Sequence, residues 1–144
     1  MSIMDRQNWM GLLARARPAD LAALLPDLPQ SQWLRPPEVG TVMVQGRTGG
    51  SGAPFHLGEI TVTRCSLQLT CGTVGHAHVQ GRDRDHAHRA ALVDALMQTG
   101  AAADLQARIL APLARIETDA RAARAGRAQA TKVDFFTLVR GEDA

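Results

Sequence analysis

The hydrophobic pattern of this chain changes its period twice, and this limits the folds open to it. Residues 5–16 place apolar side chains at helical spacing. From residue 41 the pattern alternates, with Val42 and Val44 on one face of an expected strand. Helical spacing returns from residue 84. The pattern predicts an α+β fold with N-terminal helices, a central antiparallel β-sheet, C-terminal helices and a terminal strand.

The N-terminal part is expected to form two helices and a connector. The first helix covers residues 5–16, and the second begins at Pro18, which suits a first helical turn. Pro26 and Pro29 end the second helix. The stretch "RPPEVG", residues 35–40, contains consecutive prolines and is therefore predicted to be a rigid connector.

The alternating region predicts an antiparallel meander of three strands. The first strand is "GTVMVQGR", residues 40–47, and the loop "RTGGSGAPFHLG", residues 47–58, follows it. The other two strands lie within residues 58–81, with a turn near "TCGT", residues 70–73.

The second strand contains a change of parity. Ile60 and Val62 share one face, whereas Leu67 and Leu69 share the other. A bulge or break near Arg64 to Ser66 would reconcile them.

The C-terminal part is expected to be mainly helical. Residues 84–98 form a helix that ends at Gly100 and packs on the sheet through Ala90, Leu92, Val93, Leu96 and Met97. Residues 103–129 continue as helix, kinked or restarted at Pro112, with an apolar stripe of Leu105, Ile109, Leu113 and Ile116. Residues 131–144 are expected to form a strand and a polar tail. The length of the chain, 144 residues, suits one domain covering residues 1–144.

Charge and hydropathy exclude two classes of partner. A net charge of +2 argues against bulk electrostatic binding of nucleic acid, and the apolar runs are too short for a membrane span. Asp5, Arg6 and Gln7 stand where a signal peptide would be apolar. Cys65 and Cys71 form no CxxC pair, which suits a reducing compartment. We therefore expect a cytoplasmic protein.

The histidines raise the question of a metal. His76 and His78 lie two apart on an expected strand, so both rings project from one face, as in some zinc sites. His86 and His88 lie on an expected helix, where two residues apart point in different directions. A third ligand would have to be His86 or Asp83. A polar strand face beside one buried histidine is the simpler interpretation, and we expect no metal site.

The same stretch permits a phosphate site. Asp83 is a good helix N-cap, and Gly81 allows a sharp exit from the strand. Arg89 points inward near His86, one turn after Asp85. Such an arginine either holds a phosphate or forms a structural ion pair, and the residues leave both possibilities open.

The loop from Arg47 to Gly52 raises the phosphate question again. Its three glycines would let backbone N–H groups approach an anion. It lacks the P-loop pattern, however, and a strand rather than a helix follows it. A flexible turn is the alternative interpretation.

Two stretches near the C-terminus suggest contact with a partner. The last helix carries a basic run on an otherwise alanine-rich surface, formed by Arg115, Arg121, Arg124, Arg127 and Lys132. The segment "VDFFTLV" is predicted to be core or a contact strip. No pairing of nucleophile and base is recognisable, so the catalytic residues are unknown.

Six stretches together resemble the G subunit of the bacterial carbon–phosphorus lyase core complex. The resemblance runs in order from Arg6 to Gly141 and is carried by "RQNWMGLLARA", "RPPEVGTVMVQGRTGGSGAPFHLGE", "TVTR", "GTVGHAHVQGRDRDHAHRAALVDALMQ", "APL" and "KVDFFTLVRG". The region from Arg115 to Thr131 is the least distinctive.

The resemblance implies a role in phosphonate catabolism. In that family, the G, H, I and J subunits form a hetero-octamer, and the K and L subunits serve the same pathway. The G subunit is needed with the H, I and L subunits to form ribose 1-methylphosphonate 5-triphosphate from ATP and methylphosphonate. The resemblance implies no cofactor on this chain, with ATP a substrate of the complex, and places the known metal ligands on other subunits.

The resemblance also selects the residues that could touch phosphate. They match family motifs and are arginines, loop glycines or an inward histidine: Arg47, Gly49, Gly50, Gly52, Arg64, Arg82, His86, Arg89 and Arg140. Our first hypothesis is an accessory, mainly structural subunit that is not catalytic alone. The alternative is an enzyme subunit that binds nucleotide or phosphonate directly through its arginines and glycine loop.

Overall fold

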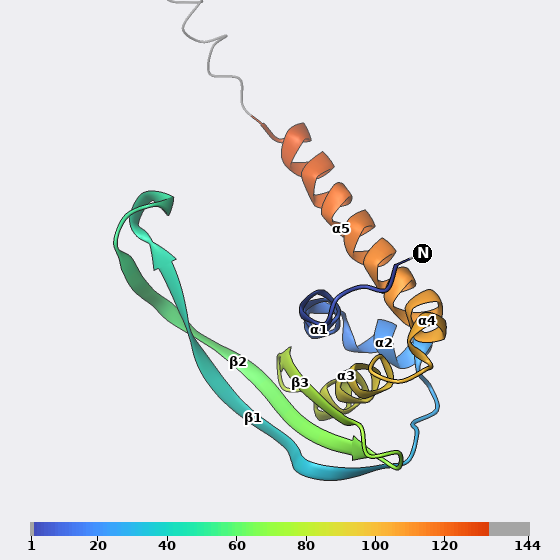
Figure 1. The fold of residues 1–144 in the computed structure, drawn as a ribbon. Helices are drawn as coiled ribbons and strands as arrows, with labels where there is room; N and C mark the ends of the chain where they lie inside the picture. The colour runs from blue at the N-terminus through green and yellow to red at the C-terminus, as the bar shows by residue number, and fades with distance from the viewer. Residues whose placement is uncertain (1, 133–144) are drawn as a thin grey trace, which may run out of the picture. The chain divides into compact units, whose positions relative to one another are not determined.

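The computed structural model describes residues 2–132 of the chain (Figure 1). The chain divides into two compact units, residues 1–114 and residues 115–144. The first unit contains two N-terminal helices, a three-stranded sheet and a helix after the sheet. The α+β prediction is therefore confirmed. The predicted terminal strand lies outside the described residues, and the single-domain organisation stays a prediction.

Both predicted N-terminal helices are present. Helix α1 is Arg6–Arg15, and its N-cap Asp5 accepts a hydrogen bond of 2.9 Å from the backbone N–H of Asn8. Helix α2 is Pro18–Leu24, with Pro18 in its first turn as expected.

The sheet is the predicted antiparallel meander. Strands β1 (Ser31–Arg47), β2 (Pro54–Leu69) and β3 (Val74–Gln80) lie in the order β1-β2-β3. The β2–β3 turn falls at residues 70–73, where the sequence placed it.

Two predicted loops of the meander are wrong. Residues 35–40 are not a connector, because β1 already begins at Ser31 and runs through both prolines. Proline is tolerated here since β1 is an edge strand, and the pairing shifts register between Arg35 and Glu38. The predicted loop 47–58 shrinks to a short turn around the 3-10 segment η1 (Thr48–Gly50), because β2 resumes at Pro54.

The expected irregularity near Arg64 lies on the neighbouring strand. Strand β2 is continuous, and it pairs with β3 without a shift from Val62 to Gln68. The extra residues belong to β1, where the shift between Arg35 and Glu38 faces Ser66 and Arg64.

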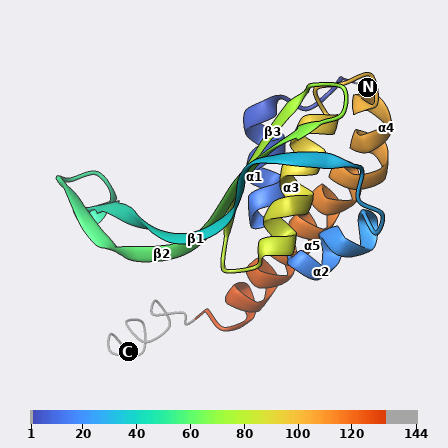
Figure 2. The same ribbon diagram turned by 90° about the horizontal axis from the view of Figure 1, so that it is seen from below.

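The helices of the first unit cover one face of the sheet (Figure 2). Helix α3 is Arg84–Leu96 and packs on β2 and β3, while α1 packs on β3 and α3. Gly81 has a φ of +94° and gives the sharp exit from β3, and Asp83 caps α3 through the backbone N–H of His86. Of the residues expected to face the sheet, Ala90, Leu92, Val93 and Met97 are buried and Leu96 is half-buried.

After α3 the chain continues mainly as helix, interrupted by one π-helical segment. Helix α4 (Ala102–Leu105) leads into the π-helical segment η2 (Gln106–Leu110) and then α5 (Ala111–Ala130). The π-helical segment ends at Leu110, two residues before Pro112, close to the interruption that the sequence predicted. The apolar stripe is buried from Leu105 through Leu113 and ends there.

The second unit contains the remainder of α5. From residue 117 to residue 130 almost every position is exposed. Ile116, the last member of the predicted stripe, is 36% exposed. The four arginines of the predicted basic run lie on α5, whereas Lys132 lies beyond its end. Arg121 pairs with Glu117 at 2.7 Å.

Candidate functional site

The glycine loop forms a closed hairpin turn at the tip of β1 and β2. Gly49 and Gly50 have φ values of +63° and +85°, which favour glycine. The backbone N–H of Gly52 donates to the Thr48 carbonyl at 2.7 Å, and the Arg47 guanidinium donates to the Gly52 carbonyl at 3.3 Å. The Gly52 N–H and the Arg47 guanidinium therefore already make hydrogen bonds within the loop. This favours a structural turn over an anion-binding loop.

Arg64 is far from that tip. It lies in β2 opposite Glu38 of β1 and His78 of β3. From Glu38 to Arg47 the strand extends for about 30 Å, at roughly 3.3 Å per residue. Arg64 and the loop glycines cannot bind the same phosphate group.

His86 and Arg89 hold helices together. His86 is 2% exposed, and its Nε2 donates to the Leu13 carbonyl of α1 at 2.8 Å. Arg89 donates to the Leu25 carbonyl, just after α2, at 3.2 Å. Within residues 2–132 no ion pair joins Arg89 to Asp85, and such a pair was one of the two possibilities that the sequence left open. These contacts favour the structural alternative for both residues, and a phosphate role stays a prediction.

The remaining predicted residues are dispersed. Arg82 is exposed between β3 and α3. Arg140 lies outside the described residues. Within residues 2–132, the structure thus places the predicted phosphate contacts at the hairpin tip, in mid-sheet, just before α3 and along α3, and it does not assemble them into one site.

The histidines are arranged as their spacing predicted. His76 and His78 are exposed on one face of β3. His86 is buried, and the His88 ring contacts Trp33 in a tilted arrangement, with ring centroids 4.6 Å apart and an interplanar angle of 51°. Across residues 2–132, no three His, Cys, Asp or Glu side chains are grouped closely enough to hold a metal ion.

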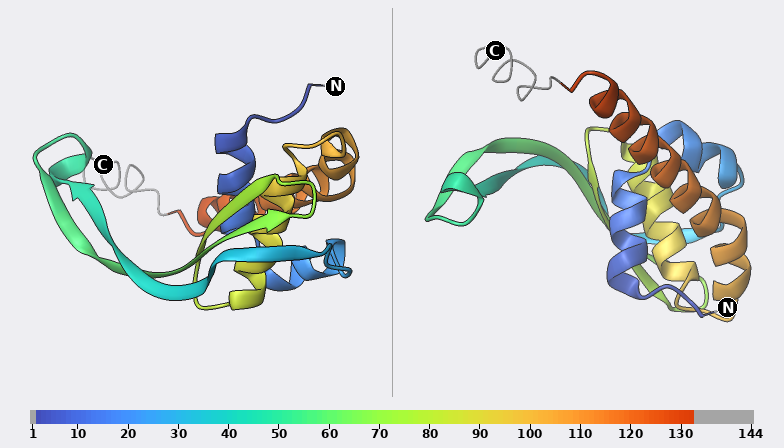
Figure 3. Two further views of the ribbon diagram at one scale, coloured as in Figure 1. Left: turned by 60° about the horizontal axis from the view of Figure 1, so that its bottom comes forward. Right: turned by 90° about the horizontal axis from the view of Figure 1, so that it is seen from above.

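Within residues 2–132, the distal part of the hairpin has no third strand. β3 ends at Gln80, opposite Val62, and the backbone N–H of Gly81 donates to the Thr61 carbonyl at 2.9 Å. Beyond that point, among the described residues, residues 40–47 and 54–61 form strand pairs only with each other. We call this two-stranded ribbon the arm, and Figure 3 shows it leaving the helical layer of the first unit. Isolated two-stranded ribbons are marginally stable in water.

One face of the arm is apolar. Val42 lies opposite Ile60, and the Phe55 and Leu57 side chains cover Gly46. We call this the apolar arm face, and it consists of Val42, Val44, Phe55, Leu57 and Ile60. Phe55, Leu57 and Ile60 are 43%, 63% and 39% exposed.

The opposite face of the arm is mostly polar. It carries Thr41, Gln45 and Glu59, with Met43 as an apolar exception. A ribbon that is apolar on one side and polar on the other, with its apolar side in water, is typical of a protein–protein contact. The sequence interpretation missed this surface because it placed Phe55 and Leu57 in a loop.

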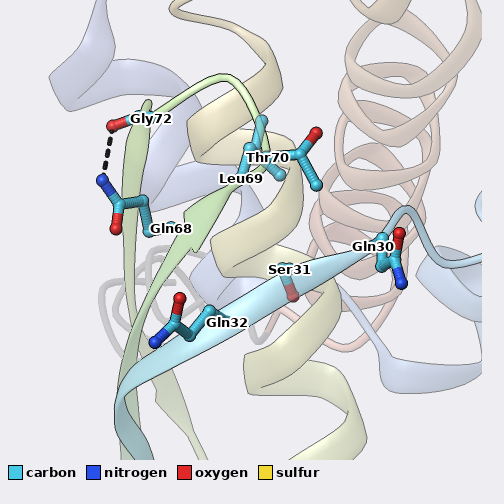
Figure 4. Close-up of a pocket in the computed structure, with 7 residues that line it drawn as sticks. All are labelled: Gln30, Ser31, Gln32, Gln68, Leu69, Thr70 and Gly72. Atoms are coloured by element: carbon cyan, nitrogen blue, oxygen red, sulfur yellow. Dashed lines mark hydrogen bonds between the residues drawn. The ribbon is translucent and has the colours of Figure 1, made fainter.

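A separate hollow of about 460 Å³ lies where β1 begins and β2 ends (Figure 4). Its lining carries no charged side chain: Gln30, Ser31, Gln32, Gln68, Leu69, Thr70 and Gly72. The Gln68 amide donates to the Gly72 carbonyl at 3.1 Å. No sequence signal pointed to this hollow, because its residues come together only through strand pairing.

No helix within residues 2–132 has the length and apolar character needed to cross a membrane.

The chain is similar to known proteins along nearly its whole length. Residues 4–141 match the family described as phosphonate metabolism protein PhnG. A protein of Rhizobium meliloti (strain 1021), named alpha-D-ribose 1-methylphosphonate 5-triphosphate synthase subunit PhnG, is 43% identical over 145 aligned positions, which cover 98% of this chain and 92% of that protein. This agrees with the resemblance found in the sequence motifs. The chain belongs to the PhnG family of phosphonate metabolism proteins.

Proposed function

We propose that this chain is an accessory subunit of a ribose 1-methylphosphonate 5-triphosphate synthase and docks a neighbouring subunit through its apolar arm face. The observation that carries the proposal is that Phe55, Leu57 and Ile60 lie exposed on one side of a ribbon that has no third strand within residues 2–132. The similarity to a protein named as a subunit of such a synthase supports a protein as the occupant of that face.

The dispersal of the predicted phosphate contacts also supports an accessory role. Arg47 and Arg89 donate to carbonyls of their own chain. His86 is buried between helices. Ser66 Oγ and His76 Nδ1 lie 2.7 Å apart, but His76 is exposed to solvent and Ser66 is only half-buried. Within the described residues, the His76 ring has no further hydrogen-bond partner. A chain with this arrangement contributes to catalysis by ordering a neighbour.

The resemblance to the G subunit of carbon–phosphorus lyase makes the proposal more specific. It implies the H, I and J subunits as direct partners, the K and L subunits as members of the same pathway, and ATP as a substrate of the assembly. Cytoplasmic location, and the absence of a cofactor on this chain, belong to the same proposal.

Charge placed on the apolar arm face tests the docking role. Leu57→Asp combined with Ile60→Asp should lower co-purification with the other synthase subunits at least about tenfold, because burying a charge in an apolar contact costs more than about 1.4 kcal/mol. Met43→Asp is the matched control, since Met43 is 55% exposed on the opposite face of the same ribbon. It should co-purify like the unmodified chain.

Synthase activity supplies the second readout. It should fall with assembly in the double variant and remain in the control. Undiminished co-purification of the double variant would show that the arm is not the docking surface.

A further inference from the structure

The face of the sheet that the helices leave bare carries ordered polar rows. We call it the outer face. Strand register places Arg64 between Glu38 and His78, and Ser66 between Arg35 and His76. The next row along the strands, toward the end of β2, pairs Gln32 with Gln68. Both of these glutamines line the hollow of Figure 4. A charged region and a neutral hollow therefore adjoin on one face.

Two arginines on this face share one carboxylate. Arg35 Nε and Arg64 Nε each lie 4.0 Å from the same Glu38 oxygen. The other described arginine–carboxylate pairs are shorter, at 2.7 to 2.9 Å. Both side chains are more than half exposed, and within residues 2–132 neither guanidinium has a hydrogen bond. Two planar forks with free donors are suited to a tetrahedral oxyanion.

His76 adds an oriented donor. Its Nδ1 lies 2.7 Å from Ser66 Oγ, and its backbone N–H donates to the buried carboxylate of Asp94 at 2.9 Å. When the Ser66 hydroxyl donates to Nδ1, the proton of the neutral ring sits on Nε2. The ring then presents a donor to the open face.

The hollow differs in chemistry from the part of the outer face that carries Arg35 and Arg64. Its glutamine, serine and threonine side chains both donate and accept hydrogen bonds and carry no charge. Such groups are suited to hydroxyls. A ligand with an anionic end and a neutral polyol end would match both parts of the face.

We propose that the outer face is a binding site for a phosphorylated sugar, with the phosphate on Arg35, Arg64 and His76 and the sugar hydroxyls at Gln32 and Gln68. This inference rests on the proposed function and adds a ligand contact to it. An ordinary solvated sheet face would explain the polar side chains. It does not explain two arginines with one distant carboxylate beside a neutral hollow.

The site is continuous with the docking surface. No register shift interrupts β1 between Glu38 and Val44, so Glu38, Val42 and Val44 share one face with Ile60 and Arg64. A subunit docked on the apolar arm face would lie next to Arg35 and Arg64. That subunit could then contribute further residues to the site.

Calorimetric titration of the intact chain, alone and within the co-purified assembly, tests the site. The probes are ribose 5-phosphate, inorganic phosphate and ribose. We expect ribose 5-phosphate to bind more tightly than either of the others. Arg64→Gln should weaken both phosphate-bearing probes about tenfold, because a charge-assisted hydrogen bond contributes about 1.5 kcal/mol or more.

Two further variants separate the parts of the site. Gln68→Ala should weaken ribose 5-phosphate and leave inorganic phosphate unchanged. Arg124→Gln, on the exposed helix α5, is the control and should change neither. Thermal unfolding followed by circular dichroism checks that each variant is folded.

Three outcomes would overturn the inference: no binding of ribose 5-phosphate to the chain or the assembly, equal binding to Arg64→Gln, or equal weakening by Arg124→Gln. The docking role fails separately, when Leu57→Asp with Ile60→Asp still assembles. Failure of one proposal can therefore be told from failure of the other.

Discussion

At the scale of single residues, Asp94 ties three elements together. Its side chain is 0% exposed, yet its oxygens accept four N–H bonds: two from Arg6, one from the Trp9 indole and one from the His76 backbone. A buried carboxylate is tolerated only when it is paired and hydrogen-bonded in this way. Asp94 therefore holds α1 and β3 against α3.

Removal of that carboxylate should be costly. Asp94→Ala leaves the Arg6, Trp9 and His76 donors without their acceptor, so we expect the free energy of unfolding to fall by about 3–5 kcal/mol. Asp104→Ala is the control, because its pair with Arg108 is exposed, and it should cost less than about 0.5 kcal/mol. Urea unfolding measures both, and equal losses would contradict this role for Asp94.

The two cysteines should differ in reactivity. Burial raises the pKa of the Cys65 thiol to about 11, so this group stays protonated at pH 8. The Cys71 thiol is exposed, and the hydrogen bond with the Thr73 hydroxyl lowers its pKa. A disulfide reagent at pH 8 should modify Cys71 alone in the folded chain and both thiols in urea. Rapid labelling of folded Cys71→Ser would show that Cys65 is accessible.

At the scale of elements, Gly75 sets how closely α3 approaches the sheet. A Cβ at Gly75 would collide with the Ala91 carbonyl and with Ala95. The helix therefore lies directly against the backbone of β3. Alanines at these positions of α3 make the same close approach possible.

Gly75→Ala should force the helix and the sheet apart. Overpacking of this kind costs about 1–3 kcal/mol of unfolding free energy. Gly40→Ala is a control within the same sheet, since a Cβ there meets nothing within 4 Å, and we expect a change below about 1 kcal/mol. Unfolding midpoints that move equally for the two variants would contradict the close packing inferred at Gly75.

Elements with a clear period or cap could be predicted from the sequence. Helix α1 follows from helical spacing, and helix α3 follows from helical spacing with Asp83 as its cap. The start of β1 could not be predicted, because Pro36 and Pro37 suggest a break and only the edge position of the strand makes them acceptable. A separate error, the prediction of a loop over residues 47–58, hid the part of β2 that contains Phe55 and Leu57.

At the scale of the whole molecule, strand register determines which residues form the outer face and the apolar arm face. Arg64 was among the predicted phosphate contacts, but Arg35 and His76 become its neighbours only once β1 and β3 are paired with β2. The apolar arm face likewise combines residues from both sides of a turn. Sequence reasoning could recognise the family and led to the hypothesis of an accessory role, whereas the proposed contact surface required the structure.

Hydrogen–deuterium exchange gives the most direct test that the arm docks a partner subunit. The backbone amides of residues 40–47 and 54–61 should exchange rapidly in the isolated chain and at least about tenfold more slowly in the assembled synthase, because docking buries the ribbon. Helix α3, already buried against the sheet, should change far less. Exchange in the arm that stays equally fast in the assembly would contradict the account.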